Sequence, residues 1–242
     1  MTRTCSVAVS MLALISLDAA AQDGGSSTPP QPFSGKAALG YIATSGNTDS
    51  TSANASLSLR FAGDDWRHGF DISGVGASTD DATTAESYLF KYEARRSFGE
   101  HNFLFTTLDY KRDRFSGYAE QVSQTVGYGR RIVDLDRHAL DTGVGFGARQ
   151  SELRDGTEED DAIVRGTVDY LWTLSETTEF EQTLVIESGA TNTMTDARSA
   201  LRARIIGDVA LVLSYRIKLN SSVPEGSENA DRFTTISLEY AF

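Results

Sequence analysis

The chain has 242 residues, a formal net charge of −12 and 40% hydrophobic residues. This acidic balance argues against nucleic-acid binding, which needs a basic face. After the first residues, no stretch is long and apolar enough for a transmembrane helix.

Residues 1–21 have the features of a secretory signal peptide. Arg3 precedes an apolar run from Val7 to Leu17, and small residues at 19–21 provide a cleavage site. The run is too short to span a bilayer as a helix. The alternative, a buried helix of the mature protein, leaves the cleavage-like site unexplained. Cys5 is the single cysteine, so we expect no disulfide and no cysteine-based zinc site after cleavage.

Residues 22–33 are a polar, proline-bearing segment that we expect to be a flexible periplasmic linker. From there to residue 242, apolar and polar residues alternate with the period of two that is typical of strands. The chain ends on such a strand, with aromatic Tyr240 and Phe242, as bacterial outer-membrane barrels usually do. The predicted strands are residues 35–45, 50–62, 65–78, 84–98, 101–114, 118–133, 138–152, 160–174, 178–189, 197–206, 209–220 and 231–242.

The connections between these strands are of two kinds. The tight ones follow even-numbered strands, at residues 63–64, 99–100, 135–136, 175–176 and 207–208. The longer, acidic ones follow odd-numbered strands, at residues 80–83, 153–160, 190–196 and 221–230. Short turns at one end and long loops at the other are typical of outer-membrane barrels. The sequence therefore predicts an all-β fold, a 12-stranded antiparallel up-and-down transmembrane β-barrel. The register of the fifth strand is left open, because residues 103–105 are all apolar.

Aromatic residues gather near the short-turn ends of the strands. We expect them to form a girdle at the lipid–water interface, where amphipathic rings are stable. Aromatic packing in a soluble β-protein is the alternative, and it leaves this sorting unexplained. The predicted girdle consists of Trp66, Trp172, Phe180, Tyr240 and Phe242.

The alternation assigns charges of both signs to the lumen. Paired charges that close the lumen are one interpretation, since buried charges need partners. A hydrophilic path for ions or small solutes is the other. Barrels of about eight strands are filled by side chains and those of about sixteen leave a channel, so a count of twelve does not decide. The predicted lumenal residues are Arg60, Asp71, Lys91, Glu93, Arg95, Arg131, Asp141, Arg149, Arg165, Asp169, Glu181, Glu187, Arg202, Arg204, Arg216, Lys218 and Glu239.

The residues give little support for catalysis or for a metal or cofactor site. His68, His101 and His138 are isolated from one another and lie near short turns, so we expect interfacial roles and no enzyme. The acidic run 158–161 offers oxygen ligands for Ca²⁺ or Mg²⁺, or a cation bridge to lipopolysaccharide phosphates. A solvated loop is the simpler interpretation of that run. Residues 45–48, Ser-Gly-Asn-Thr, suit a tight turn.

Three short motifs resemble the salt-induced outer-membrane protein family typified by YdiY. They are Thr-Ser-Gly-Asn-Thr-Asp at 44–49, Asp-Arg-Phe-Ser-Gly-Tyr at 113–118 and Leu-Glu-Tyr-Ala-Phe at 238–242. The resemblance covers roughly residues 35–242. It implies an outer-membrane barrel and a link to salt stress, with no established reaction.

We therefore predict a monomeric barrel in the bacterial outer membrane, with lipid and lipopolysaccharide around it. The barrel-assembly machinery is expected to insert it through the C-terminal strand. The predicted role is in the envelope under salt stress, as a narrow pore for ions or small solutes. The alternative is a non-conducting structural or surface-interaction barrel with acidic extracellular loops.

Overall fold

The structure is a computed structural model that describes residues 32–44, 50–80, 82–114, 118–223 and 228–242. The predicted signal peptide and nearly all of the predicted linker lie outside the described residues, as does the predicted turn at 45–48. Within the described parts of the chain, no helix is long and apolar enough to cross a membrane.

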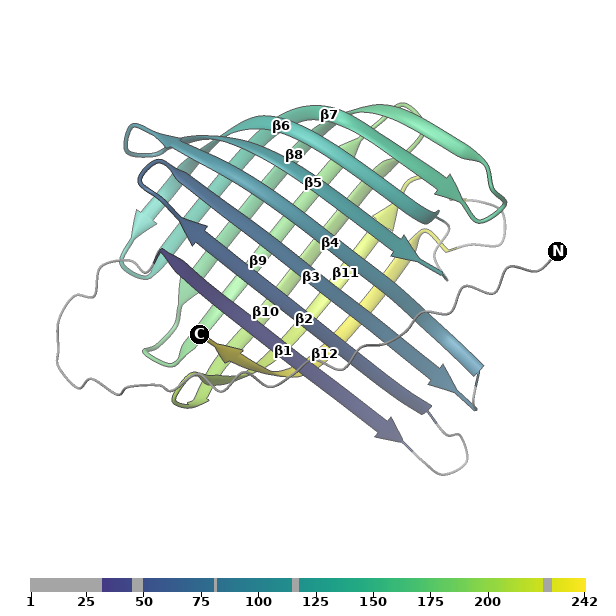
Figure 1. The fold of residues 1–242 in the computed structure, drawn as a ribbon, viewed down its shortest axis with the longest axis horizontal. Coiled ribbons are helices and arrows are strands. Elements are labelled where there is room, and N and C mark those ends of the chain that lie inside the picture. Colours follow the sequence, from purple (N-terminus) through teal and green to yellow (C-terminus); the bar gives the residue numbers. More distant parts are fainter. Residues whose placement is uncertain (1–31, 45–49, 81, 115–117, 224–227) are drawn as a thin grey trace.

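The chain forms a closed barrel of twelve strands in sequence order (Figure 1). Each strand is antiparallel to the next, and the last pairs with the first. The predicted fold is confirmed, and strand bounds agree within a few residues. The strands are β1 Phe33–Thr44, β2 Ser50–Ala62, β3 Trp66–Thr79, β4 Ala82–Phe98, β5 Asn102–Asp113, β6 Tyr118–Leu135, β7 His138–Leu153, β8 Glu158–Thr173, β9 Thr178–Ser188, β10 Thr193–Ile206, β11 Val209–Asn220 and β12 Ala230–Ala241.

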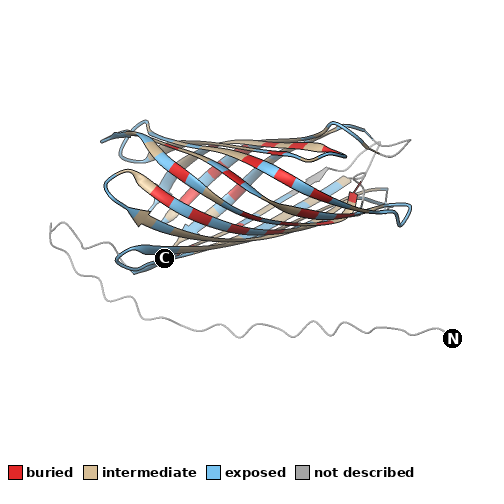
Figure 2. Ribbon diagram, turned by 90° about the horizontal axis from the view of Figure 1, so that it is seen from above, coloured by how far each residue is buried: buried red, intermediate tan, exposed pale blue. Residues whose placement is uncertain are grey.

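The two faces of the sheet differ as the alternation requires. Leu39 on β1 is 70% exposed on the outside, whereas Ala38 beside it is buried on the inside. Figure 2 shows buried positions alternating with exposed ones along several strands. An outer surface rich in exposed leucine, isoleucine, valine and aromatic side chains matches the apolar band of a membrane barrel.

The barrel closes where β12 meets β1. Tyr240 lies opposite Ala37, and Leu238 lies opposite Leu39. The N–H of Phe242 donates to the carbonyl of Gly35 at 2.9 Å, and the N–H of Gly35 donates back at 2.7 Å. This pairing removes the two free edges that an open sheet would expose to lipid.

Glycines on β6 fix the register of β5, which the sequence left open. Phe103 and Phe105 point into the barrel and are 6% and 4% exposed, whereas Leu104 points outward. A Cβ on Gly129 would lie 2.2 Å from the Phe103 ring, and one on Gly127 would lie 2.4 Å from the Phe105 ring. The rings therefore fit only because β6 has no side chains at these two positions.

The connections differ less in length than we predicted. The loops expected at 153–160 and 190–196 shrink to 154–157 and 189–192, because β8 and β10 begin earlier than expected. Pairing continues outward to Glu152 opposite Glu158 and to Ser188 opposite Thr193. We call the end with residues 63–65, 99–101, 136–137, 174–177 and 207–208 the short-turn end, and the opposite end the long-loop end.

A close backbone approach at Gly147 yields a stability prediction. A Cβ there would lie 1.8 Å from the carbonyl oxygen of Gln124, whereas a Cβ on Gly166 meets nothing within 4 Å. Gly147→Ala should lower the free energy of unfolding by about 1–3 kcal/mol, because the strands must separate locally. The matched control Gly166→Ala should change it by less than about 1 kcal/mol. Urea unfolding from lipid vesicles measures both, and equal effects would contradict the close approach of β6 and β7.

Candidate functional site in the barrel lumen

The lumen contains a cavity of about 780 Å³. Its walls come from β1–β5 and β8–β12, and it extends from Ser34 and Arg67 near the short-turn end to Lys111 and Lys218. Strands β6 and β7 do not line it, because the rings of Phe103 and Phe105 and other inward side chains cover them. A volume of this size is typical of small-molecule sites.

The lining of the cavity is rich in charge and has a positive excess. Eleven basic and eight acidic residues contribute to it, whereas the whole protein has a net charge of −12. The basic residues are Lys36, Arg60, Arg67, Lys91, Arg95, Lys111, Arg165, Arg198, Arg202, Arg216 and Lys218. The acidic residues are Asp71, Glu93, Asp109, Asp169, Glu181, Glu187, Asp196 and Glu239.

Most of the lumenal charges predicted from the sequence line this cavity. Arg131, Asp141 and Arg149 instead pair with charges beside it and do not line it. Arg204 lies exposed near the short-turn end, beside the register shift between Arg204 and Ile206. The predicted residues that line the cavity are Arg60, Asp71, Lys91, Glu93, Arg95, Arg165, Asp169, Glu181, Glu187, Arg202, Arg216, Lys218 and Glu239.

Several charged lining residues were not predicted from the sequence. Asp109 and Lys111 lie on β5, whose register was open, and Asp196 lay in a predicted loop. Arg198 lies on a predicted strand, and extending the alternation from Arg202 would have found it. Arg67, at the start of β3, was also not predicted, although extending the alternation from Asp71 would have found it.

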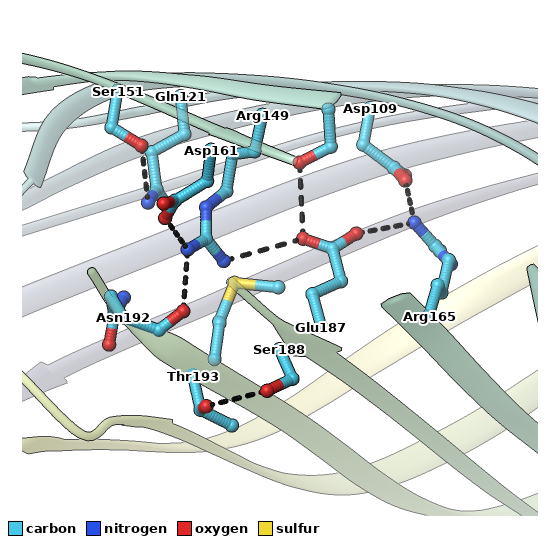
Figure 3. Close-up of polar contacts among 12 residues, drawn as sticks. Asp109, Gln121, Arg149, Ser151, Asp161, Arg165, Glu187, Ser188, Asn192 and Thr193 are labelled. Atoms are coloured by element: carbon cyan, nitrogen blue, oxygen red, sulfur yellow. Dashed lines mark hydrogen bonds and ion pairs between the residues drawn. The ribbon is translucent and has the colours of Figure 1, made fainter. Parts of the chain in front are cut away.

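Arg165 on β8 is the centre of a buried ion-pair network (Figure 3). Its Nη1 atom donates to Asp109 Oδ2 at 2.5 Å and to Glu187 Oε1 at 2.7 Å. All three side chains are less than a tenth exposed. Asp109 lies on β5, so this guanidinium passes over β6 and β7, where Gly145 lies opposite Arg165 in the register.

Arg149 extends the network toward the long-loop end. Its Nη2 atom donates to Asp161 Oδ2 at 2.9 Å and to the carbonyl of Asn192 at 2.7 Å. Its Nη1 atom lies 3.9 Å from Glu187, which also accepts a hydrogen bond from the Ser123 hydroxyl at 3.1 Å. Glu187 therefore lies between two arginines (Figure 3), and this half of the lumen is filled by paired charge.

Near the short-turn end, Asp141 joins two arginines. Arg95 Nη1 donates to it at 2.7 Å, and Arg131 Nε donates at 2.8 Å. The guanidinium of Arg95 also lies 3.8 Å from the centre of the Phe103 ring, a favourable cation–π position. The inward phenylalanine therefore helps to hold a cation at the cavity wall.

Contacts across the lumen narrow it toward the long-loop end. Lys111 Nζ on β5 lies 3.1 Å from Met194 Sδ on β10. The Tyr118 hydroxyl donates to the carbonyl of Ser222 at 3.2 Å. A separate pocket of only about 20 Å³ lies there, with Lys111, Tyr118 and Met194 in its walls. We call these three residues the constriction.

The acidic run 158–161 is not a loop, which corrects our expectation. It begins β8 and pairs with β7, so its side chains alternate between the two faces of the sheet. Asp161 points inward to Arg149, and Asp160 is exposed. Pairing with β7 thus separates carboxylates that a chelating loop would bring together.

The turn between β7 and β8 consists of residues 154–157. There the backbone N–H of Thr157 donates to Asp155 and lowers the pKa of that carboxyl.

The predicted girdle residues lie on the outer face near the short-turn end. Trp66 stacks on His68, whose Nδ1 lies 2.9 Å from the Tyr92 hydroxyl. Trp172 and His138 form a second cluster of this kind, with Tyr170 2.8 Å from the His138 ring.

Phe180 lies opposite Trp172 in the register, and the rings of Tyr240 and Phe242 stack.

Among the described residues, no group of three His, Cys, Asp or Glu side chains could hold a metal ion.

Comparison with known proteins identifies the family. A family model described as "Protein of unknown function, DUF481" matches residues 37–242. The chain belongs to this family. The uncharacterised protein YdiY of Escherichia coli strain K12 is 30% identical over 93% of this chain and 92% of its own length. The resemblance predicted from the three motifs is confirmed.

Solved outer-membrane proteins resemble this barrel. The COG4313 outer-membrane channel from Pseudomonas putida F1 has a TM-score of 0.53 at 11% identity, over 89% of this chain and 99% of that one. The NanC porin has a TM-score of 0.46 at 11% identity, over 85% of this chain and 97% of that one. The closed twelve-stranded barrel and its likeness to the COG4313 channel show that the DUF481 chain has the fold of outer-membrane barrels.

Removing the cation at the centre of the network should destabilise the barrel. Arg165→Met would leave Asp109 and Glu187 buried without their shared partner, so the free energy of unfolding should fall by about 3–5 kcal/mol. Lys36→Met is the control, because Lys36 and Glu181 are 3.9 Å apart and partly exposed. Its effect should stay below about 1 kcal/mol in the same urea titration. Equal losses of unfolding free energy in the two variants would show that the buried network stabilises the barrel no more than a partly exposed ion pair does.

Proposed function

We propose that this DUF481 protein is a bacterial outer-membrane barrel that provides a narrow passage for ions or small hydrophilic solutes and catalyses no reaction. The observation that carries the proposal is the cavity of about 780 Å³ inside a closed barrel. Its charged lining favours water over apolar contents, since polar cavities hold water.

The outer surface supports the proposed location. Exposed apolar side chains such as Leu39 and Phe146 surround the barrel, and aromatic residues lie at its short-turn end. We infer that lipid and lipopolysaccharide cover this surface, that the protein is a monomer and that β12 presents the chain to the barrel-assembly machinery. A role under salt stress rests on the family resemblance alone, and growth of a deletion strain at raised NaCl measures it.

The constriction is the narrowest part of the proposed passage and limits its width. Lys111 and Met194 come from β5 and β10 and meet across the lumen, and the pocket at that end is small. These contacts favour the second candidate, a non-conducting structural barrel. Lys111 and Met194 have long, flexible side chains, so a modest rearrangement opens a path between them.

Planar-bilayer recording separates the two candidates. Protein extracted from the outer-membrane fraction should give small, discrete currents. The double variant Lys111→Ala/Met194→Ala should raise the single-channel conductance by about twofold or more, because it widens the narrowest section. Arg232→Gln, which changes an exposed residue of β12 that does not line the cavity, should leave the conductance unchanged.

Folded protein that gives no current in either form would reject the passage and leave the non-conducting barrel. Absence of the protein from the outer-membrane fraction would contradict the proposed location.

A further inference from the structure

Two pairs of arginines lie directly opposite each other across neighbouring strands in the cavity wall. Arg198 on β10 is opposite Arg216 on β11, and Arg67 on β3 is opposite Arg95 on β4. All four line the cavity. Like charges in this position repel each other and destabilise a sheet. The chain therefore places positive charge where folding alone does not favour it.

In each pair, one arginine is held by a carboxylate and the other is not. Arg216 binds Asp196 through two hydrogen bonds, from Nε at 2.8 Å and from Nη2 at 2.5 Å. Arg95 binds Asp141 at 2.7 Å. Arg198 and Arg67 make no hydrogen bond or ion pair with any residue that the structure describes.

The residues around Arg198 are compatible with the binding of an anion. Both carboxylate oxygens of Asp196, the nearest acid on its own strand, are engaged by Arg216. Thr183, its neighbour across β9, carries a hydroxyl that can donate a hydrogen bond. Arg198 lies deep in the wall and is half-buried, whereas Arg67 is exposed near the short-turn end. The cavity as a whole contains eleven basic and eight acidic residues.

We propose that the cavity binds small multivalent anions, carboxylates or phosphates, at the guanidinium of Arg198. Guanidinium groups bind carboxylate and phosphate through two parallel hydrogen bonds, and enclosure strengthens such contacts. Arg216, opposite Arg198, engages the carboxylate of Asp196 and so leaves Arg198 available to a bound anion, and Arg67 attracts anions at the short-turn end. This inference rests on the proposed function only in that it names the solutes of the passage, since binding itself needs no current.

Isothermal titration calorimetry on the full-length protein in detergent tests the binding. Citrate and inorganic phosphate, titrated separately at low salt, show which anion is preferred, and choline is the cationic control. At least one of the two anions should bind, choline should not, and raising the NaCl concentration should weaken the binding. Arg198→Gln should weaken it by about tenfold or more, because one charge-assisted double hydrogen bond is lost. Arg232→Gln removes the same charge outside the cavity and should change affinity by less than about twofold.

Reversal potentials in a KCl gradient provide a second, separate readout. They should show preference for chloride over potassium, and Arg198→Gln should move the potential toward zero. If the folded barrel binds anions and passes no current, the passage is rejected and the anion site stands. If Arg198→Gln binds anions as tightly as the unaltered protein, or if neither anion binds, the anion site is rejected. A current carried by cations would reject anions as the solutes of the passage.

Discussion

Closure of the sheet between β1 and β12 is the constraint on which the rest of the structure depends. A bilayer offers no hydrogen-bond partners, so every strand must pair within the protein. Pairing along Lys36–Leu39 of β1 removes both edges. Once the sheet is closed, each strand has a lipid face and a lumen face. The apolar members of the alternation then face lipid, and most of the charged members of the strands face the interior.

That confinement makes charge pairing the main problem of the lumen. The half near β5–β9 solves it with the Arg165 network, in which two carboxylates share one guanidinium. Glycines on β6 and β7 leave the space that the inward rings of Phe103 and Phe105 occupy. The other half keeps an open cavity, and there Arg198 is left without an acid among the described residues. Closure of the sheet thus underlies the fold, the filling of one half of the lumen by ion pairs and the proposed anion site in the other half.

The alternation and the terminal strand predicted the twelve strands, the antiparallel barrel and most of the lumenal charges. The prediction failed where non-local contacts decide the structure. Residues 103–105 fit either register equally well, and glycines of the neighbouring strand select one. The acidic run looked like a loop because the partner of Asp161, Arg149, lies on another strand. For the same reason, no sequence pattern shows which of Arg216 and Arg198 is held by an acid.

A disulfide across the closing strands tests the closed barrel most directly. Leu39 and Leu238 face outward and lie opposite each other, so cysteines there are within disulfide reach. The variant Leu39→Cys/Leu238→Cys, with Cys5→Ser, should form an intramolecular crosslink when the folded, heat-modifiable protein is oxidised. Leu39→Cys/Leu201→Cys, which places the second cysteine on the outer face of β10, should not. Folded protein that fails to crosslink in the first pair, or crosslinks equally in the second, would contradict closure between β1 and β12.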